Sequence, residues 1–376
     1  MELIKRLSRT HIDWILVLAL IPILGAGLLT MNAFEGANRF FEHQLLWIGV
    51  AFAVFFAVSS VDMGFLKRTN VLMTLFAFFC TLLIALFVLG HSIKGARSWF
   101  DFGGFSFEPA DMTKLVVILI LSKYFSRRHV EIAHFKHIIV SGFYAFVPFA
   151  LILFQPDFGS AIIIFFIWFG MVMVSGLSRK HLLVVLTIGV MAFGGLWYFM
   201  LADYQKARIK NFLDPLANIH GTGWNAYQST IAVGSGGLLG KGVGYGTQSR
   251  LKFLPEYQTD FIFAAFAEEW GFAGVGILFL LFSIVIWRIL ANALVGAGNF
   301  EMLFGMGLAI FFMAHFAINV GMNMGVMPVT GITLPFLSYG GSHLVTEFLG
   351  LGILMSFRRH SRAAHRDDMK NEFLGV

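Results

Sequence analysis

Charged residues are scarce in this chain. Only 13% of its 376 residues are Asp, Glu, Lys or Arg, whereas 58% are hydrophobic and the mean hydropathy is +0.78. Soluble domains carry roughly 25% charged residues, and a soluble fold of this size needs such a surface to cover its core. The composition therefore excludes a disordered chain and an ordinary soluble enzyme. It predicts an all-α polytopic membrane protein.

Cysteine is almost absent, and so are metal and nucleotide motifs. Cys80 is the only cysteine, so the chain cannot form an internal disulfide and its exported loops must be ordered by packing. The twelve His are scattered, and the glycine-rich run 234–242 lacks the residues of a phosphate loop or a dinucleotide fingerprint. A divalent cation (Mg²⁺ or Mn²⁺) held by carboxylates and a substrate phosphate leaves no spacing signal, so that alternative stays open. The net charge of +6 is attributed to basic cytoplasmic loops and not to nucleic-acid binding.

What the chain has in abundance is apolar runs. A helix rising 1.5 Å per residue needs about 20 apolar residues to cross a hydrocarbon core ~30 Å thick. Ten windows qualify, at residues 13–31, 43–61, 71–90, 111–125, 138–154, 159–175, 181–201, 260–288, 301–324 and 343–357. The first is too long for a signal peptide and lacks a small-residue cleavage site, so we expect it to be retained. The eighth carries an acidic pair, and we expect it to tilt or protrude.

The distribution of Lys and Arg predicts the orientation. With a cytoplasmic N-terminus, sixteen basic residues fall in the inner segments and nine in the outer ones. This bias predicts that both termini are cytoplasmic, with a cytoplasmic tail over 358–376. Residues 203–259 then form a large extracytoplasmic loop between the seventh and eighth helices, within a single domain of residues 1–376. A loop of this length is usually functional. Its glycine-rich part, with Lys241, either holds an anion on backbone amides or simply turns at the membrane surface.

Several charged residues lie at the outer ends of the predicted spans, where charge is costly. Asp260 opens the eighth span and is either a helix cap or a catalytic group. Asp111 and Lys114 lie three residues apart on one helix face, so they either neutralise each other or place a cation at the outer interface. Asp157, in a short turn after a proline, either caps the next helix or serves a substrate.

Two further polar groups lie inside the eighth and ninth spans. At about 100° per residue, Glu268 and Glu269 cannot lie on the same helix face as Asp260, the first residue of their span. One face therefore cannot present all three acids to a substrate, and we interpret the pair as interhelical contacts. His315, Asn319 and Asn323 recur every four residues and predict interhelical hydrogen bonds. Together, the acids, bases and glycine turns at the outer face suit an anionic, membrane-bound substrate such as a lipid pyrophosphate. The pattern does not say whether that substrate is polymerised, moved or only bound.

Sequence strings spread over nearly the whole chain together resemble the SEDS family (shape, elongation, division and sporulation proteins), and within it the members that maintain rod shape. They include Gln155-Pro156-Asp157-Phe158-Gly159, Asp203-Tyr204-Gln205 with Arg208, Gly246-Thr247-Gln248-Ser249, Thr259-Asp260-Phe261, Pro328-Val329-Thr330-Gly331 and Ser338-Tyr339-Gly340-Gly341-Ser342. Ten spans and a large loop between the seventh and eighth also match the family.

The resemblance implies a peptidoglycan glycosyltransferase that polymerises lipid II, a disaccharide-pentapeptide on undecaprenyl pyrophosphate, outside the cytoplasmic membrane. It implies a class B penicillin-binding protein, a transpeptidase, as partner, and it places the family's catalytic aspartate on Asp260. The residues expected to contact the substrate are Asp111, Lys114, Asp157, Arg208, Lys241, Gln248 and Ser338. Two alternatives remain, a lipid II flippase and a non-catalytic subunit that activates the transpeptidase.

The implied reaction is an inverting sugar transfer. Asp260 would act as general base on the 4-hydroxyl of the acceptor GlcNAc, and the pyrophosphate leaving group would need a cation from Lys114, Arg208, Lys241 or a divalent ion. The chain departs from the family pattern at two positions. Asp111 stands where the family often has Glu, and Ser98 stands where an Arg is common.

Overall fold

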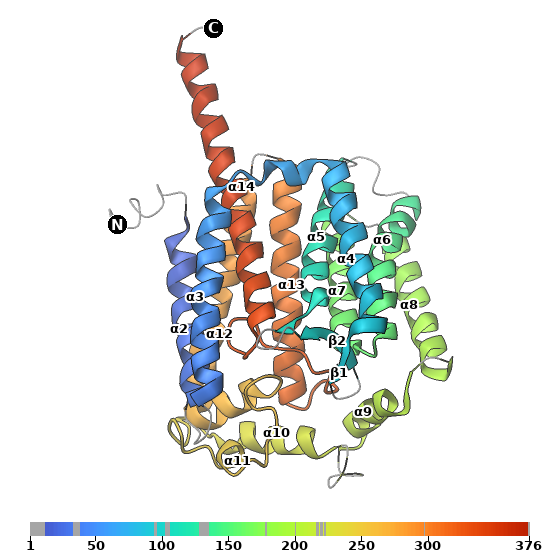
Figure 1. Ribbon diagram of the computed structural model, residues 1–376, viewed down its shortest axis with the longest axis vertical. Coiled ribbons are helices and arrows are strands. Elements are labelled where there is room, and N and C mark those ends of the chain that lie inside the picture. The colour runs from blue at the N-terminus through green and yellow to red at the C-terminus, as the bar shows by residue number, and fades with distance from the viewer. Residues whose placement is uncertain are drawn as a thin grey trace.

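The fold is a bundle of long helices, seen in a computed structural model (Figure 1). The structure describes residues 12–32, 38–93, 96–101, 106–127, 135–176, 179–199, 201–215, 218, 221, 223–296 and 298–374. The basic residues of the expected N-terminal segment, much of the expected cytoplasmic segment 126–137, and the end of the expected tail lie outside the described residues.

Every predicted span coincides with a helix. The helices are α2 (Trp14–Asn32), α3 (Asn38–Ser60), α4 (Thr69–Leu89), α5 (Pro109–Ser126), α6 (Phe135–Phe154), α7 (Phe158–Val174), α8 (Arg179–Phe199), α12 (Ile262–Leu294), α13 (Asn299–Asn323) and α14 (Gly341–Leu374). Among the described residues, seven helices are long and apolar enough to cross a membrane. α7 is one turn shorter than most of them, while α5 and the apolar part of α14 carry charged side chains that lower their hydropathy.

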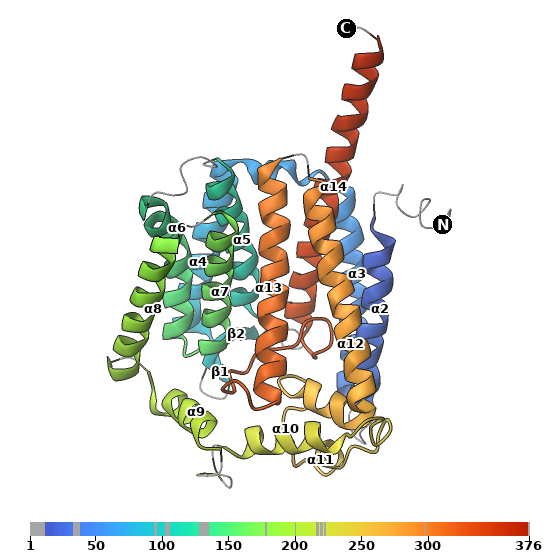
Figure 2. The ribbon, with the colours of Figure 1, turned by 180° about the vertical axis from the view of Figure 1, so that it is seen from behind.

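The remaining elements gather at one end of the bundle. The expected outer loop contains α9 (Asp203–Leu213), α10 (Trp224–Ser235) and α11 (Thr247–Arg250), which lie across the end opposite the projecting C-terminal part of α14 (Figures 1 and 2). A small antiparallel sheet, β1 (His91–Ile93), β2 (Ala96–Asp101) and β3 (Ser106–Phe107), lies at the same end. The all-α expectation missed this sheet, because its strands are too short to show an alternating pattern. A 3₁₀ turn, η1 (Met63–Lys67), links α3 and α4.

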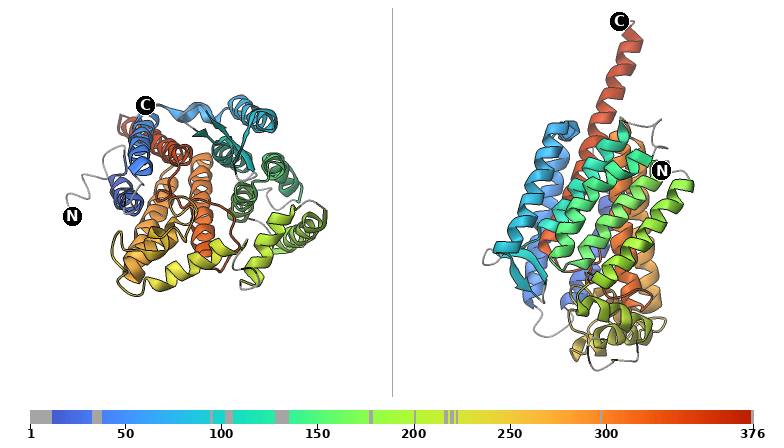
Figure 3. Two further views of the ribbon diagram at one scale, coloured as in Figure 1. Left: turned by 60° about the horizontal axis from the view of Figure 1, so that its bottom comes forward. Right: turned by 90° about the vertical axis from the view of Figure 1, so that its right-hand side faces the viewer.

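The core forms around α5 and α13. Nearly every residue of α5 is buried, and α13 lies at the centre of the bundle (Figure 3). α3 packs against α14, and α12 packs against both α2 and α13. α8 lies at the edge, with its large apolar side chains exposed (Figure 2). Polar side chains on the two central helices are thus enclosed by the chain, as the cost of charge in a bilayer requires.

The predicted eighth span is broken at Gly271. Its backbone there has φ 62° and ψ −166°, which only glycine adopts readily. A methyl group on Gly271 would lie 2.2 Å from the amide nitrogen of Gly240, and one on Gly240 would lie 2.0 Å from the carbonyl oxygen of Glu269. The two backbones therefore touch, and both glycines are required for this contact.

The glycine loop supplies the hydrogen bonds that the break removes. The amides of Lys241 and Gly242 donate to the carbonyls of Glu268 and Glu269, each at 3.0 Å. In the other direction, the amides of Phe272 and Ala273 donate to the loop carbonyls of Gly237 and Leu238. Helix ends leave such groups without partners, and the loop satisfies them on both sides of the break. α12 is thereby divided into a short segment, Ile262 to Trp270, and a long one.

Candidate functional site

Asp260 lies immediately before the short segment of α12. The cap position belongs to Phe261, whose side chain makes no capping hydrogen bond, so neither Thr259 nor Asp260 occupies it. Of the two alternatives for Asp260, the helix cap therefore does not hold. Helix α12 begins one residue later than a cap at Asp260 would place it, because Phe261 has φ −109° and ψ 21°.

Two asparagines of α13 hold the backbone at Asp260. The side-chain amides of Asn319 and Asn323 each donate to the Asp260 carbonyl oxygen at 3.0 Å. Asn319 also donates to the carbonyl of Ile332 at 2.7 Å. The polar stripe on the ninth span does form interhelical hydrogen bonds, as predicted, since Asn323 also accepts from Ala264 of α12, and it binds loop backbone groups as well.

The loop between α13 and α14, residues 324–340, packs on the Asp260 segment. The Ser338 hydroxyl donates to the carbonyl of Thr259 at 2.7 Å, and the Tyr339 amide donates to the carbonyl of Gln258 at 2.8 Å. The same Ser338 hydroxyl accepts from the Leu334 amide at 2.8 Å. Ser338, expected to contact a substrate, therefore joins the two loops that form the site.

Gly331 marks the point where Asp260 and Arg208 come together. A methyl group on Gly331 would lie 3.4 Å from Oδ2 of Asp260 and 4.0 Å from Nη1 of Arg208. Gly331 has φ +77°, so its backbone conformation favours glycine as well. Arg208 also lines a small recess with apolar walls, together with Gln205 and Thr330. The carboxylate and the guanidinium thus border one position at the end of the bundle that carries α9, α10 and α11.

Asp157 is a helix cap. Its Oδ1 accepts from the Ser160 amide at 3.0 Å at the start of α7, in accord with the turn-and-cap alternative. Gly159, in the first turn of α7, lies close to the α13–α14 loop, because a methyl group there would lie 2.8 Å from the Thr330 carbonyl oxygen. Asp157 therefore helps to place α7 beside the loop that carries Gly331.

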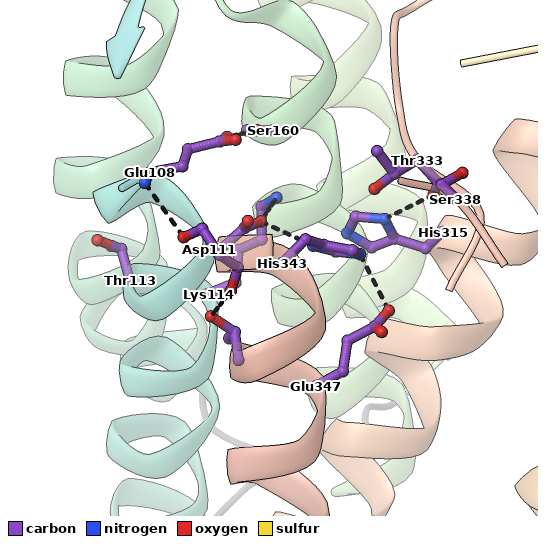
Figure 4. A network of polar contacts seen from close by, with 12 residues as sticks. Glu108, Asp111, Thr113, Lys114, Ser160, His315, Thr333, Ser338, His343 and Glu347 are labelled. Carbon is purple, nitrogen blue, oxygen red and sulfur yellow. Dashed lines mark hydrogen bonds and ion pairs between the residues drawn. The ribbon is translucent and has the colours of Figure 1, made fainter. Parts of the chain in front are cut away.

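A buried network of charged side chains lies beneath this loop (Figure 4). Lys114 Nζ lies 2.9 Å from Asp111 Oδ1, so the two groups neutralise each other, as one of the two alternatives predicted. The same oxygen lies 3.1 Å from Nδ1 of His343, whose Nε2 lies 3.0 Å from Oε1 of Glu347. The imidazole of His343 thus lies between the carboxylates of Asp111 and Glu347.

The network also reaches the site loop and the start of α5. Glu347 Oε2 accepts from the Phe336 amide at 3.2 Å, and His315 Nδ1 lies 3.3 Å from the Thr333 carbonyl oxygen. At its other edge, Glu108 accepts from the Ser160 hydroxyl at 3.4 Å. Burial, reinforced by the nearby carboxylate of Asp111, raises the pKa of Glu108 well above its ordinary value.

His343 and Glu347 were not among the expected site residues. A His and a Glu inside the last apolar window, four residues apart and hence on one helix face, were the available signal. Ser98, one of the two departures, is buried in β2. Asp111 is the other departure, and its side chain, shorter than the Glu of the family pattern, contacts both Lys114 and His343.

Lys241 and Gln248 belong to a different cluster, around Glu268. The Glu268 carboxylate accepts from Lys241 Nζ at 2.7 Å, from the Thr247 hydroxyl at 3.0 Å and from the backbone amide of Gln248 at 3.2 Å. Glu269 accepts from the Gly244 amide at 2.9 Å. The acidic pair thus holds the loop 203–259. Because Thr247 and Gln248 belong to α11, the contacts of Glu268 lie between helices, as predicted. The anion on the glycine turn is the protein's own carboxylate, and the charge of Lys241 is engaged by Glu268.

The described residues do not form a metal site by themselves. Among them, no group of three or more His, Cys, Asp or Glu side chains is arranged to hold an ion. Asp111 is instead paired with Lys114 of the same network. The geometry therefore offers one carboxylate beside one guanidinium, at Gly331, supported by two loops and a buried charge network.

The comparison with known families agrees with this arrangement. Residues 6–363 match the family of cell cycle proteins named for FtsW, RodA and SpoVE. The chain belongs to this family. The FtsW/RodA/SpoVE family is the group that the sequence strings indicated, and the match covers all ten long helices except the C-terminal end of α14.

Individual relatives extend over most of the chain. It is 38% identical over 281 residues to the peptidoglycan glycosyltransferase MrdB of Escherichia coli K12. The aligned residues cover 75% of this chain and 76% of MrdB. It is 35% identical over 367 residues to the stage V sporulation protein E of Bacillus subtilis 168, covering 94% and 99% of the two chains.

Solved structures share the fold. The rod shape determining protein RodA of Thermus thermophilus superposes with a TM-score of 0.70 at 29% identity, covering 93% of this chain and 97% of RodA. A chain of a peptidoglycan synthase complex that coordinates polymerisation and crosslinking superposes with a TM-score of 0.79 at 28% identity, covering 93% and 98%.

Proposed function

We propose that this protein is a peptidoglycan glycosyltransferase of the cytoplasmic membrane that serves cell elongation. The observation that carries the proposal is the Asp260 carboxylate beside the Arg208 guanidinium at Gly331. The relatives named as peptidoglycan glycosyltransferases support the activity, and the similarity to MrdB and RodA supports the role in elongation. The apolar helices and the membrane-protein relatives support a multi-pass protein.

The proposed topology has ten membrane-spanning helices. Both termini are cytoplasmic, and the loop 203–259 is extracytoplasmic. The bias of Lys and Arg supports this orientation. The position of α9, α10 and α11 opposite the end of α14 supports it as well, since the loop and the tail then lie on different sides (Figure 1).

The proposed substrate is lipid II. Its undecaprenyl chain stays in the bilayer while its pyrophosphate and sugars reach the outer end of the bundle, where Asp260 and Arg208 lie. Asp260 removes the proton from the 4-hydroxyl of the acceptor GlcNAc. That oxygen attacks the anomeric carbon of the donor MurNAc from the face opposite the pyrophosphate, so an α-linked donor gives a β-1,4 bond. A single inverting displacement needs a base and no covalent sugar intermediate.

Arg208 is the proposed cation for the leaving pyrophosphate. It borders the same point as Asp260. A guanidinium also matches the geometry of phosphate oxygens. Because the described residues do not form a metal site by themselves, no step is assigned to Mg²⁺ or Mn²⁺.

The proposed partner is a class B penicillin-binding protein. The similarity to a chain of a complex that joins polymerisation to crosslinking supports it. The transpeptidase would use the glycan strand at the outer face where the strand is made.

The test is the variant Asp260→Asn, purified and incubated with fluorescent lipid II, with the products separated on a gel. We expect polymerisation to fall by roughly 10²–10⁴-fold, the usual yield of general-base catalysis. Asp260→Glu should also lose activity, because the longer side chain displaces the carboxylate by about 1 Å or more. Protein amount should persist in both variants.

Asp62 offers a matched control. It is a true helix cap at the other end of the bundle, where its Oδ1 accepts from the Gly64 amide at 2.7 Å. Asn caps as well as Asp, so Asp62→Asn should keep wild-type polymerisation. Wild-type amounts of glycan from Asp260→Asn would refute the catalytic assignment. Wild-type protein that makes no glycan, with or without the transpeptidase, would instead favour a flippase or a non-catalytic subunit.

A further inference from the structure

The short segment of α12 is capped from another helix. Its third amide after the cap position, that of Ala264, donates to Oδ1 of Asn323 at 3.2 Å, and Asn323 belongs to α13. In most helices this amide is accepted by the side chain at the cap position itself. Here the cap residue is Phe261, which has no side-chain acceptor. An asparagine 59 residues further along the chain therefore performs the capping function.

The orientation of Asn323 is determined by its neighbours. Its Oδ1 accepts from the Ala264 amide and from the Ser229 hydroxyl at 3.1 Å. Its Nδ2 faces two carbonyl oxygens, those of Asp260 at 3.0 Å and Asn319 at 2.8 Å. Reversing the amide would place donor against donor and acceptor against acceptor, so the other orientation is excluded.

Asn319 completes the arrangement. Its two N–H groups are both used, one on the Asp260 carbonyl and one on the Ile332 carbonyl. Ile332 follows Gly331, whose backbone adjoins the Asp260 carboxylate. Both asparagines are fully buried. One amide group therefore connects the backbone of Asp260 to the loop segment that its carboxylate faces.

We propose that Asn319 and Asn323 are positioning residues for Asp260. Asn323 takes over the cap of α12, so the carboxylate of Asp260 is directed toward Gly331 and Arg208 and not toward its own helix. The two amides fix the Asp260 carbonyl, and through it the direction of the side chain. This inference rests on the proposed role of Asp260 as the general base.

The experiment compares Asn323→Asp and Asn323→Ala with Asn292→Ala. Asn323→Asp keeps the acceptor for the Ala264 amide and the shape of the side chain, but it replaces the donor to the Asp260 carbonyl with an oxygen. Asn292 is a matched control, since it is a buried asparagine of α12 whose amide donates to Asp13 at 2.7 Å, in a contact far along the helix from Asp260. Initial rates of lipid II polymerisation are measured against lipid II concentration, and thermal unfolding gives the folded fraction.

We expect kcat to fall roughly 10–100-fold in both Asn323 variants with KM changed less than about two-fold, because a displacement near 1 Å at the reacting group costs about this much. Asn292→Ala should keep kcat per folded molecule even where its Tm falls. In an Asp260→Asn background, Asn323→Asp should cause no further loss, since it acts through a carboxylate that is no longer there. If the Asn323 variants do not accumulate, Asn319→Asp removes the donors to Asp260 and Ile332 and gives the same test.

Two results would overturn the proposal. One is wild-type kcat in Asn323→Asp or Asn319→Asp while Asp260→Asn is inactive. The other is an equal further loss when Asn323→Asp is added to Asp260→Asn, which would indicate a general structural role. A wild-type rate in Asp260→Asn alone would instead refute the proposed general base, so the two failures are distinguishable.

Discussion

Gly331 lies between the two side chains on which the proposed chemistry depends. Its φ of +77° is strained for any L-residue, and the position of its missing Cβ is 3.4 Å from Asp260 Oδ2 and 4.0 Å from Arg208 Nη1. A side chain at this position would occupy the space where a sugar hydroxyl has to approach the carboxylate. Gly331 therefore allows the backbone to turn and leaves space beside Asp260, the proposed base.

We predict that Gly331→Ala lowers the initial rate of lipid II polymerisation by about ten-fold or more. The left-handed conformation costs an alanine about 1–2 kcal/mol, so the protein should still fold. Gly49→Ala in α3 is the control, because a methyl group there meets nothing within 4 Å and alanine favours a helix. Equal rates for Gly331→Ala and wild type, at equal protein amounts, would show that the space beside Asp260 is not used.

Residues with local partners were predictable, and those with distant partners were not. Asp111 and Lys114 are three apart on one helix, so their pairing follows from the sequence alone. His343, which binds the same carboxylate, lies 232 residues away, and no pattern in one sequence connects the two. The cap of α12 shows the same limit, since sequence spacing suggested Asp260 or Thr259 whereas the acceptor comes from α13.

At the scale of elements, apolar length predicted where every long helix begins to within about five residues, but α12 and α14 continue beyond their predicted ends, to Leu294 and Leu374. What it could not predict is the break in α12. Apolar residues continue on both sides of Gly271 apart from the acidic pair, and hydropathy does not report φ and ψ. The break places Glu268 and Glu269 beside the loop 203–259, whose helix α11 supplies Thr247 and Gln248 as partners of Glu268. The three strands escaped prediction because they are too short to show an alternating pattern.

We predict that Glu268→Gln loosens the loop that wraps the break. Its buried carboxylate accepts from Lys241, Thr247 and Gln248, and charged hydrogen bonds of this kind are worth about 1.5–3 kcal/mol each. Trypsin should then cleave after Arg250 or Lys252 roughly 10–100-fold faster than in the wild type, because proteolysis follows the population of the open loop.

Glu301→Gln is the matched control for this prediction. Glu301 is also buried and also paired with a lysine, Lys67, but at the opposite end of the bundle. It should leave the rate of loop cleavage unchanged. If trypsin cuts Glu268→Gln no faster than the wild type, the loop is held by the glycine backbone contacts alone.

At the scale of the whole molecule, the arrangement of the helices and the distribution of basic residues predict which face is outside. In a Cys80→Ala background, Leu239→Cys tests the loop 203–259, because Leu239 is 79% exposed. A membrane-impermeant maleimide should label it in intact protoplasts. Arg127→Cys, at the exposed end of α5, should react only after the membrane is permeabilised. Labelling of Leu239→Cys only from the cytoplasm would contradict the ten-span topology and move the proposed site to the wrong side.

The long separation between Asp111 and its partners has a consequence for biogenesis. The ribosome adds roughly 5–20 residues per second, so His343 and Ser342, which bind at the start of α5, are synthesised about 10–50 s after it. During that interval α5 has to enter the bilayer with Lys114 as the partner of Asp111. Charge in a membrane span is costly, and a pair within one helix lowers that cost. The local ion pair thus lets α5 insert early, and α14, translated last, completes the enclosed network once the other nine helices are in place.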